Sequence, residues 1–430
     1  MANKIESLRG MDDILPGEVE KWQWLEEQAR IFFQGHGFKE IRTPILEYTE
    51  LFSRGVGEAS DIVSKEMFSF KDRGDRDITM RPEMTASVAR SVIEKGLLSQ
   101  AKSLRFFYIG PMFRAERPQA GRKRQFHQIG IEIINEEGIV SDLDALRYLY
   151  YFLKQTGVED LEVRINNLGS LDEQKIMAEK LKDYFNKNTG ALCKDCNYRL
   201  EKNVLRIFDC KNPSCQPIID KAPWEEIAPT NSYFEDVKKG LEGWDIPFQV
   251  KRRLVRGLDY YNGLVFEIGA KGLGAQDALA GGGRYDRLYT DLGGKPTPCI
   301  GFSIGMERLF MALGDSAVAR ARENVIYFAP VMSDDEYFNR NRAEAAPILL
   351  GRTIYDLAQL GMKPFLGDVR IKKIDDHFKQ ANKISAKYMV ILGPEELKNK
   401  KWTVKKMDEK TQASINWGEL YFHLKGTPSV

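Results

Sequence analysis

The chain has 430 residues, of which 64 are Lys or Arg and 62 are Asp or Glu, so its net charge near neutral pH is only +2. This length exceeds the roughly 250–300 residues at which a single core stops growing, so it predicts two or three domains. The balanced charge excludes nucleic-acid binding through an overall positive field, and no apolar run approaches the ~18 residues of a membrane span. The start, MANKIESLRG, has no apolar secretory core, so we expect a cytoplasmic protein.

The first 60 residues predict a helix followed by a short strand. Pro16 opens a helical segment, Gly17 to Phe33, in which apolar residues recur at three- and four-residue steps. A strand from Phe38 to Arg42 then runs into Pro44. Ile45 to Phe52 is apolar enough to pack at an interface or under a sheet. Because Pro cannot donate to a sheet, this position indicates a sheet margin or a subunit contact.

A hairpin and a helix start come next. Met67 to Phe70 and Ile78 to Met80 predict two strands joined by a polar turn. Glu83 and Thr85 then precede a helix from Ala86 to Leu98. Two interpretations of this pair are open: Thr85 caps the helix and Glu83 is one more acid at its N-terminus, or the carboxylate and hydroxyl bind an ammonium group.

The most distinctive stretch is a strand, a basic loop and a returning strand. Its arms are Phe106 to Phe113 and Phe126 to Ile134, and the second arm alternates as a half-buried strand does. Four cations in the loop suit a polyanion, although a solvated hairpin tip has a similar composition: Arg117, Arg122, Lys123 and Arg124. Gln128 and Glu132 share a face with period two, and Arg114 ends the first arm. Such groups are costly to bury without a partner or a ligand.

Beyond this stretch, a helix from Ser141 to Gln155 and a strand from Leu161 to Asn166 are expected. Residues 170–244 show mainly helical periodicity and a polar composition, which is typical of an insertion. Four of the five cysteines lie there, spaced Cys193-x2-Cys196 and Cys210-x4-Cys215. A zinc ribbon is one interpretation. Because cytosolic thiols also occur as plain small residues, we favour no bound metal.

Strand character returns at Phe248 to Val255, and Tyr260 and Tyr261 then precede a strand through Val265 to Ile268. Two glycine-rich runs, at 281–283 and 301–305, remove Cβ atoms where a ligand could lie against the backbone. Neither run has the Rossmann or Walker pattern. Cys299 is expected in the core. From Asn324 onward, strands and helices alternate, which predicts an α/β domain; its elements are expected at 325–329, 343–360, 364–366, 375–381 and 388–392.

Together these segments resemble the class II aminoacyl-tRNA synthetases, and among them the histidyl-tRNA synthetases. The three motifs of the class are similar to residues 37–47, 113–132 and 301–309 of this chain. Two histidine-specific signatures resemble residues 256–261 (RGLDYY) and 280–286 (AGGGRYD). The resemblance covers nearly the whole chain, and the joint match of all five segments is highly specific.

The resemblance implies a fold and a set of partners. It implies an α+β catalytic domain with an antiparallel sheet over residues 1–323, a mainly helical insertion at about 170–244, and an α/β anticodon-binding domain over residues 324–430. It also implies a homodimer that uses L-histidine, ATP with Mg²⁺, and tRNA(His). No resident metal and no membrane are expected.

The resemblance assigns roles to eleven residues. Arg114 and Arg256 would be catalytic, because both would stabilise the α-phosphate of ATP as charge develops. Histidine would be bound by Glu83, Thr85, Gln128, Glu132, Tyr260 and Tyr261; the first three would take its ammonium group, while Glu132 and Tyr261 would meet the imidazole. ATP would be bound by Arg114, Glu116, Phe126 and Arg308; the last two would sandwich adenine, and Glu116 would accept from its amino group.

The reaction implied is the formation of histidyl-adenylate from histidine and ATP, followed by transfer to tRNA. One alternative is a non-catalytic regulatory relative that binds histidine. Such relatives usually lack the anticodon-binding domain and some ATP-contacting arginines, whereas this chain keeps Arg114, Arg256 and Arg308. A second alternative is a class II synthetase for threonine, proline or glycine, and the RGLDYY signature argues against it.

Overall fold

The computed structural model describes residues 4–57, 60–227, 229, 231–271, 277–314, 316–317, 325–331, 350–367, 373–409 and 411–425. The chain forms two compact units, one of Met1–Asp13 and Glu26–Gly314 and the other of Ile14–Leu25 and Asp315–Val430. Within the described ranges, no helix has the length and apolar character needed to cross a membrane.

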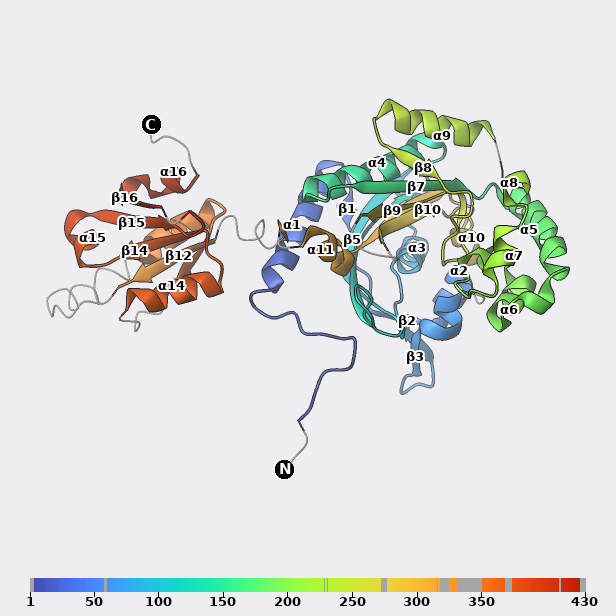
Figure 1. Ribbon diagram of the computed structural model, residues 1–430, viewed down its shortest axis with the longest axis horizontal. Coiled ribbons are helices and arrows are strands. Elements are labelled where there is room, and N and C mark those ends of the chain that lie inside the picture. Colours follow the sequence, from blue (N-terminus) through green and yellow to red (C-terminus); the bar gives the residue numbers. More distant parts are fainter. Residues whose placement is uncertain are drawn as a thin grey trace. The chain divides into compact units, whose positions relative to one another are not determined.

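The larger unit is built on an eight-stranded sheet, drawn in Figure 1. Its strands, in spatial order, are β1 (Lys39–Glu40), β5 (Leu104–Phe113), β6 (Gln125–Ile134), β11 (Cys299–Gly305), β10 (Ala278–Arg284), β9 (Asn262–Ala270), β7 (Leu161–Asn167) and β8 (Phe248–Val250). The outer pairs β1 with β5 and β7 with β8 are parallel, and the pairs between them are antiparallel. The predicted antiparallel sheet is confirmed.

One face of this sheet is covered by two long helices, α1 (Val19–Gly35) and α4 (Ile139–Thr156). Phe107 of β5 stacks on Phe33 of α1 with 5.8 Å between ring centres, and Phe33 lies 5.2 Å from Phe152 of α4. Every second side chain of β5 and β6 therefore points into this aromatic layer, as the alternation predicted for the second arm implies. The remaining positions of β5 and β6 face the opposite side.

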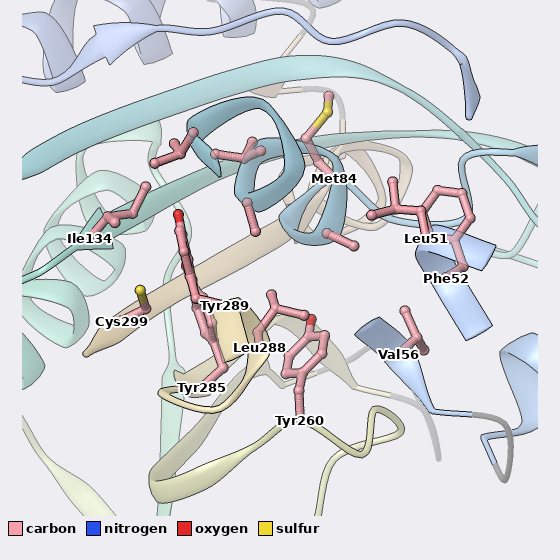
Figure 2. Close-up of a cluster of buried hydrophobic side chains, with 14 of the residues drawn as sticks. Leu51, Phe52, Val56, Met84, Ile134, Tyr260, Tyr285, Leu288, Tyr289 and Cys299 are labelled. Carbon is pink, nitrogen blue, oxygen red and sulfur yellow. The ribbon is translucent and has the colours of Figure 1, made fainter. Parts of the chain in front are cut away.

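The opposite face packs against α2 (Thr49–Val56), α3 (Thr85–Glu94) and α10 (Leu288–Asp291). Figure 2 shows side chains of this cluster, which brings together residues far apart in sequence: Leu51, Phe52, Val56, Met84, Ile134, Tyr260, Tyr285, Leu288, Tyr289 and Cys299. The expectation that Cys299 is a core residue is confirmed, since it is fully buried. Gln128 and Glu132 have the same parity on β6 as Ile134, so they share this face.

A separate three-stranded antiparallel sheet has the order β2 (Leu46–Tyr48), β4 (Asp77–Met80) and β3 (Phe68–Lys71), which confirms the predicted hairpin. Its surface carries large apolar side chains that are 41–57% exposed: Ile45, Leu46, Tyr48 and Phe70. Leu51 and Phe52 lie instead on α2 and are buried. The apolar run at 45–52 thus divides into an exposed strand margin and a helix that packs into the core.

The insertion is mainly helical, as predicted, with α5 (Leu171–Asn186), α6 (Lys194–Lys202), α7 (Gln216–Asp220), α8 (Trp224–Ile227) and α9 (Ser232–Gly243). Ser170 and Glu173 form a reciprocal capping box that fixes the start of α5. The first four helices enclose a core of their own, which runs from Met177 to Trp224, and they gather at one end of the larger unit in Figure 1. Helix α9 returns to pack on α4.

The smaller unit has a five-stranded sheet in the order β13 (Lys363–Leu366), β12 (Val325–Pro330), β14 (Tyr388–Leu392), β15 (Lys401–Lys406) and β16 (Gln412–Asn416). Helix α14 (Ile374–Lys383) packs on one face, while residues 350–359, which are helical, and α16 (Leu420–Lys425) pack on the other. A short helix, α15 (Pro394–Asn399), precedes β15. The predicted α/β character is confirmed. Residues 343–349 of one predicted helix lie outside the described residues.

Two local expectations were wrong, and one hairpin was not predicted. The strand expected to reach Val255 ends at Val250, because the chain turns there and the Leu254 amide donates to the Lys251 carbonyl at 2.8 Å. The helix expected to reach Leu98 ends at Glu94, since Gly96 adopts a left-handed conformation with φ 59°. The hairpin of β15 and β16 was missed, because lysines flank its alternating buried side chains, Trp402 and Val404.

Candidate active site

Two adjoining cavities open on the sheet face that carries Gln128. The larger has a volume of about 550 Å³ and the smaller about 160 Å³. They share several lining residues, which form the passage between them: Ile62, Arg114, Gln128, Arg256, Gly257, Gly281 and Ser303. The structure thus brings both predicted catalytic arginines to the junction of the two cavities.

Arg256 is held at this junction by its partners on the neighbouring strand. Its Nη1 donates to Glu267 Oε2 at 2.8 Å, and Glu267 also accepts from Arg164 at 3.2 Å. Gly281 pairs with Glu267 across the sheet, and a Cβ on Gly281 would lie 2.1 Å from Nη2 of Arg256. The guanidinium therefore needs the bare backbone of Gly281. Its Nε is buried and has no hydrogen-bond partner among the described residues, so it is a donor available to a ligand.

The smaller cavity has Glu83 and Thr85 at the start of α3. The Glu83 carboxylate accepts from the backbone amides of Thr85 and Ala86, both at 2.8 Å, and lies 3.4 Å from the Tyr260 hydroxyl. Burial raises the pKa of Glu83, while these amide bonds oppose the rise. Glu83 therefore caps the helix and also lines the cavity, while binding of an ammonium group by this carboxylate stays a prediction. The Thr85 side chain makes no cap and turns to Glu132.

Glu132 lies behind the cavity wall and lines neither cavity. One carboxylate oxygen accepts from Thr85 Oγ1 at 2.7 Å, and the other accepts from the Tyr285 hydroxyl. Burial raises the pKa of Glu132 to about 8; the two hydroxyl bonds lower it, and the charge of Glu83 raises it further. A Cβ on Gly301 would lie 2.1 Å from Glu132 Oε2. Gly301, Thr85 and Tyr285, which all lie against this carboxylate, line the smaller cavity.

Gln128 and Tyr261 complete the predicted histidine-binding set. Gln128 Nε2 donates to Ser303 Oγ at 3.2 Å, which fixes the amide, and Oε1 is buried with no partner among the described residues. The Tyr261 ring lies 4.7 Å from that of Tyr260. Burial raises the pKa of Tyr261 to about 12, with the charge of Arg256 opposing the rise. The cavity therefore presents one unused acceptor and a neutral hydroxyl that stays a donor at physiological pH.

The larger cavity has an excess of cations. Its wall contains eight cationic side chains among the described residues: Arg114, Arg122, Lys123, Arg206, Lys211, Arg253, Arg256 and Arg308. Five acids accompany them: Asp61, Glu66, Glu116, Glu267 and Glu307. Such a concave and positively charged wall favours a polyanion.

The predicted adenine-binding residues, Phe126 and Arg308, line this cavity. Arg308 lies on α11 (Met306–Leu313), which begins directly after β11. Arg114 donates from Nε to the Pro82 carbonyl at 3.0 Å, and its guanidinium carbon lies 5.1 Å from the centre of the Phe126 ring. The predicted ATP-binding residue Glu116 pairs with Arg122 at 3.0 Å. Arg114 is thus positioned against an aromatic face before any ligand arrives.

Comparison with known proteins decides the family. The family model for histidyl-tRNA synthetase matches residues 10–179 and 221–309, which is more than half of the chain. The chain belongs to the histidyl-tRNA synthetase family. A second model, for an anticodon-binding domain, matches residues 354–426. The predicted family is confirmed. The match to the histidyl-tRNA synthetase model is interrupted over residues 180–220, the segment that contains the four clustered cysteines.

Individual members of the family match along nearly their whole length. A histidine–tRNA ligase of Halothermothrix orenii is 42% identical over 97% of this chain and 98% of its own length. A histidine–tRNA ligase of Pelotomaculum thermopropionicum is 40% identical over 97% of this chain and 96% of its own length. The crystal structure of apo S. aureus histidyl-tRNA synthetase matches with a TM-score of 0.71 and 32% identity, covering 98% of this chain and all of that one. The predicted ligase activity agrees with these relatives.

Several lining residues of this family member were absent from the predicted set. Tyr108, Tyr285 and Ser303 line the smaller cavity. Tyr108 could have been predicted from the alternation of side chains along β5. It pairs with Gly130, so its side chain lies on the same face of the sheet as Gln128 and Glu132. Tyr285 lies within the second histidine signature, so its position was also indicated. The larger cavity is also lined by Arg206 and Lys211 of the insertion. No sequence signal indicated these two residues.

Proposed function

We propose that the chain ligates L-histidine to tRNA(His) in two steps, through histidyl-adenylate formed from ATP with release of pyrophosphate. The observation that carries this proposal is the pair of joined cavities. The smaller one has the volume and the hydrogen-bonding groups for an amino acid, and the larger one has the cations for a nucleotide polyphosphate. Arg114 and Arg256 stand where the two substrates would meet.

In this proposal the smaller cavity binds histidine through its ammonium group and its ring. The Glu83 carboxylate supplies charge for the ammonium, the unused Oε1 of Gln128 accepts from it, and Thr85 and Tyr260 complete its surroundings. For the imidazole we propose Tyr261 and the carboxylate of Glu132. An apolar ring of the same shape would offer no partner to the Tyr261 hydroxyl, and a site built to hydrogen-bond its substrate rejects such a ring by ~10⁴-fold.

The chemistry then needs no side-chain nucleophile. The histidine carboxylate attacks the α-phosphorus of ATP, and pyrophosphate leaves with its bond electrons. Mg²⁺ enters with ATP as part of the substrate and neutralises its phosphates. Arg114 and the unpartnered Nε of Arg256 stabilise the charge that develops on the α-phosphate, while Phe126 and Arg308 hold the adenine and Glu116 accepts from its amino group.

The regulatory alternative is disfavoured by what the chain retains. Arg114, Arg256 and Arg308 all line the larger cavity, so the nucleotide-binding cations are present. A non-catalytic histidine binder needs neither these cations nor an anticodon-binding domain, which the match to residues 354–426 supports here. We therefore assign residues 1–323 to catalysis, with an insertion at about 170–244, and residues 324–430 to recognition of the anticodon of tRNA(His).

We also propose a homodimer in the cytoplasm, formed through the small sheet of β2, β4 and β3. The support for this interface is its surface of exposed Ile45, Leu46, Tyr48 and Phe70, because large apolar side chains grouped on one small sheet favour contact with another chain. Sedimentation of the intact protein should give a dimer, and Tyr48→Glu should shift it toward monomer. A wild-type monomer at micromolar concentration would contradict the interface.

The decisive experiment is amino-acid-dependent exchange of labelled pyrophosphate into ATP. Histidine should support exchange, and threonine, proline and glycine should not. Absence of exchange with histidine would refute the enzymatic assignment, and equal exchange with another amino acid would refute the assignment of the substrate. Charging of tRNA(His) transcripts by the same preparation then tests the second step.

A further inference from the structure

The four cysteines of the insertion converge on one point. Their sulfur atoms all lie within 4.8 Å of one another, and Sγ of Cys193 lies 3.9 Å from Sγ of Cys210. They come from separate elements: Cys193 precedes α6, Cys196 lies in its first turn, Cys210 follows the 3₁₀ helix at Val204–Asp209, and Cys215 precedes α7. None of the four forms a disulfide.

The spacing of the sulfur atoms is that of a tetrahedral metal site. Four thiolates at about 2.3 Å from a central Zn²⁺ stand roughly 3.8 Å apart, close to the Cys193–Cys210 separation. Backbone amides also point at the sulfur atoms: the Cys193 amide donates to Cys215 Sγ at 3.1 Å, and the Asn212 amide donates to Cys210 Sγ at 3.4 Å. Such donors stabilise negative charge on sulfur, as ligand thiolates require.

The gap between Cys210 and Cys215 is two residues longer than the gap between Cys193 and Cys196, and the structure shows how the chain closes it. The chain between them turns tightly, with the Cys215 amide donating to the Asn212 carbonyl at 3.0 Å. This turn brings Cys215 back beside Cys210, so the longer gap still closes one pair of ligands.

The competing interpretation is that the thiols merely pack in a core. Cys196 and Cys215 are fully buried beside apolar residues such as Phe185, Leu200 and Ile219. Packing alone explains burial, but it does not require four sulfur atoms to face a common centre. A segment as short as residues 171–227 with its own core is also of the size that commonly needs a metal or disulfides for stability.

We propose that Cys193, Cys196, Cys210 and Cys215 bind one Zn²⁺ through four thiolates. The site is structural, because all four positions of a tetrahedral ion are taken by protein and none remains for a substrate. This reverses the expectation from the sequence that no metal is bound. Iron also accepts four thiolates, and the measurement below separates the two metals.

The zinc site has a consequence for the larger cavity, because Arg199 and Arg206 lie between the two cysteine pairs. Both donate to Asp61 Oδ2, at 2.6 and 3.0 Å, and Arg206 also donates to the backbone carbonyl of Arg256 at 3.2 Å. Asp61 and Arg206 line the larger cavity. The ion therefore positions a wall of the nucleotide site without touching substrate.

Elemental analysis of the full-length protein, purified under reducing conditions without chelators, tests the assignment. We expect about one zinc per chain, as for a closed structural site. Cys196→Ser and Cys215→Ser should each lose most of it, whereas Cys299→Ala, which removes the buried cysteine outside the cluster, should retain it. Iron at that stoichiometry, or zinc retained by both Ser variants, would overturn the proposal.

Reconstitution with cobalt provides a second measurement that does not depend on the folding of a variant. Wild-type protein stripped by a chelator and titrated with Co²⁺ should develop the visible bands of a tetrahedral thiolate complex, saturate at one equivalent, and lose them when Zn²⁺ is added. Protein that lacks zinc as purified and binds neither ion would refute the site.

The link to the nucleotide cavity has its own readout. Removal of zinc should raise KM for ATP in pyrophosphate exchange several-fold more than KM for histidine, and added Zn²⁺ should reverse the change. Equal changes in both constants would contradict the proposed link. Histidine-dependent exchange by wild-type protein is independent of this result, so failure of the zinc proposal would not be confused with failure of the proposed function.

Discussion

The two cavities of the active site are built in opposite ways. At the smaller one, both carboxylates are held by hydrogen bonds within the protein: Glu83 by backbone amides, and Glu132, behind the wall, by Thr85 and Tyr285. In the larger one, cations outnumber acids. A small ligand with directional N–H groups needs a rigid set of partners. The site then binds the correct ligand more tightly than an analogue, because the analogue leaves some of these partners unpaired. A polyphosphate needs uncompensated charge, which a wall of cations supplies.

Arg256 lines both cavities, so its replacement should have the largest effect on the exchange reaction. Arg256→Ala removes a donor to the developing charge and should slow histidine-dependent exchange by about 10²–10³-fold. Its partner Glu267 keeps Arg164, so thermal stability should change little. Steady-state exchange kinetics and thermal melts measure the two effects. Arg76→Ala, at an exposed turn, serves as the control, and near-normal exchange by Arg256→Ala would remove this residue from the mechanism.

Gly281→Ala should displace the same guanidinium without deleting it. The new Cβ would lie 2.1 Å from Arg256 Nη2, and the long side chain can yield at little cost to the fold. Displacement by about 1 Å at a reacting centre costs up to 10²-fold, so we expect exchange to slow by about 10–100-fold. Gly190→Ala, at a site with nothing within 4 Å, should change neither exchange nor melting. Full activity of Gly281→Ala would show that Arg256 need not lie over this backbone.

Tyr285→Phe should affect the smaller cavity alone. It removes the hydroxyl that donates to the buried carboxyl group of Glu132 and leaves that acceptor unpaired at a cost of about 1–3 kcal/mol, so it should raise KM for histidine by about tenfold. KM for ATP should stay within about twofold, because Tyr285 does not line the larger cavity.

Tyr289→Phe is a matched control from the same cluster, shown beside Tyr285 in Figure 2. Its hydroxyl is buried without a hydrogen-bond partner among the described residues, so its loss should leave both constants unchanged. If Tyr285→Phe raised the two KM values equally, the assignment of histidine to the smaller cavity and ATP to the larger would be wrong.

The last expected effect is on the stability of the fold as a function of pH, and it leaves the division between the two cavities untouched. Burial raises the pKa of Glu132 from 4.5 to about 8, so the folded state keeps a proton that the unfolded chain releases above about pH 4.5. The stabilisation from this group is fully present below pH 4.5 and is lost as the pH rises through 8. Over this window it should contribute a fall of about 1 kcal/mol per pH unit to the free energy of unfolding.

Denaturant unfolding of Glu132→Gln, which has no proton to lose, measures this contribution. The variant should show a shallower decline between pH 5 and 8 than the wild type. Burial also raises the pKa of Glu83, so the free energy of unfolding of Glu132→Gln should still decline somewhat with pH. Glu179→Gln, on an exposed position of α5, should reproduce the wild-type slope. Parallel profiles for Glu132→Gln and wild type would show that Glu132 is ionised in the folded protein.

Much of the fold was predictable because the signals are local. The apolar and aromatic composition of Phe106–Phe113 and the alternation along Phe126–Ile134 identified β5 and β6, and the order of strands and helices after Asn324 identified the class of the second unit. The bounds of β8 and α3 were wrong because a turn at Lys251 and the conformation of Gly96 ended them. Such turns are selected by a few backbone hydrogen bonds, which periodicity does not detect.

Within the candidate site, the residues were predictable and their arrangement was not. Motif positions indicated Glu83, Thr85, Gln128 and Tyr261, which all line the smaller cavity, and the family resemblance suggested their roles. That Glu132 lies one layer behind the wall depends on the approach of Gly301 from another strand, and no local pattern records this approach. Roles assigned by resemblance therefore remain proposals that the variants above can test.

The sequence by itself determined the family, the activity class and the antiparallel core, because these depend on the order of residue types along short segments. Only the tertiary structure decided how distant segments meet. It joined the two cavities at Arg256, brought Asp61 to Arg206, and drew four cysteines from two loosely spaced pairs to one centre. The physical reason is that hydrogen bonding and metal coordination depend on distances of a few ångströms in space, and these are set by packing and turns.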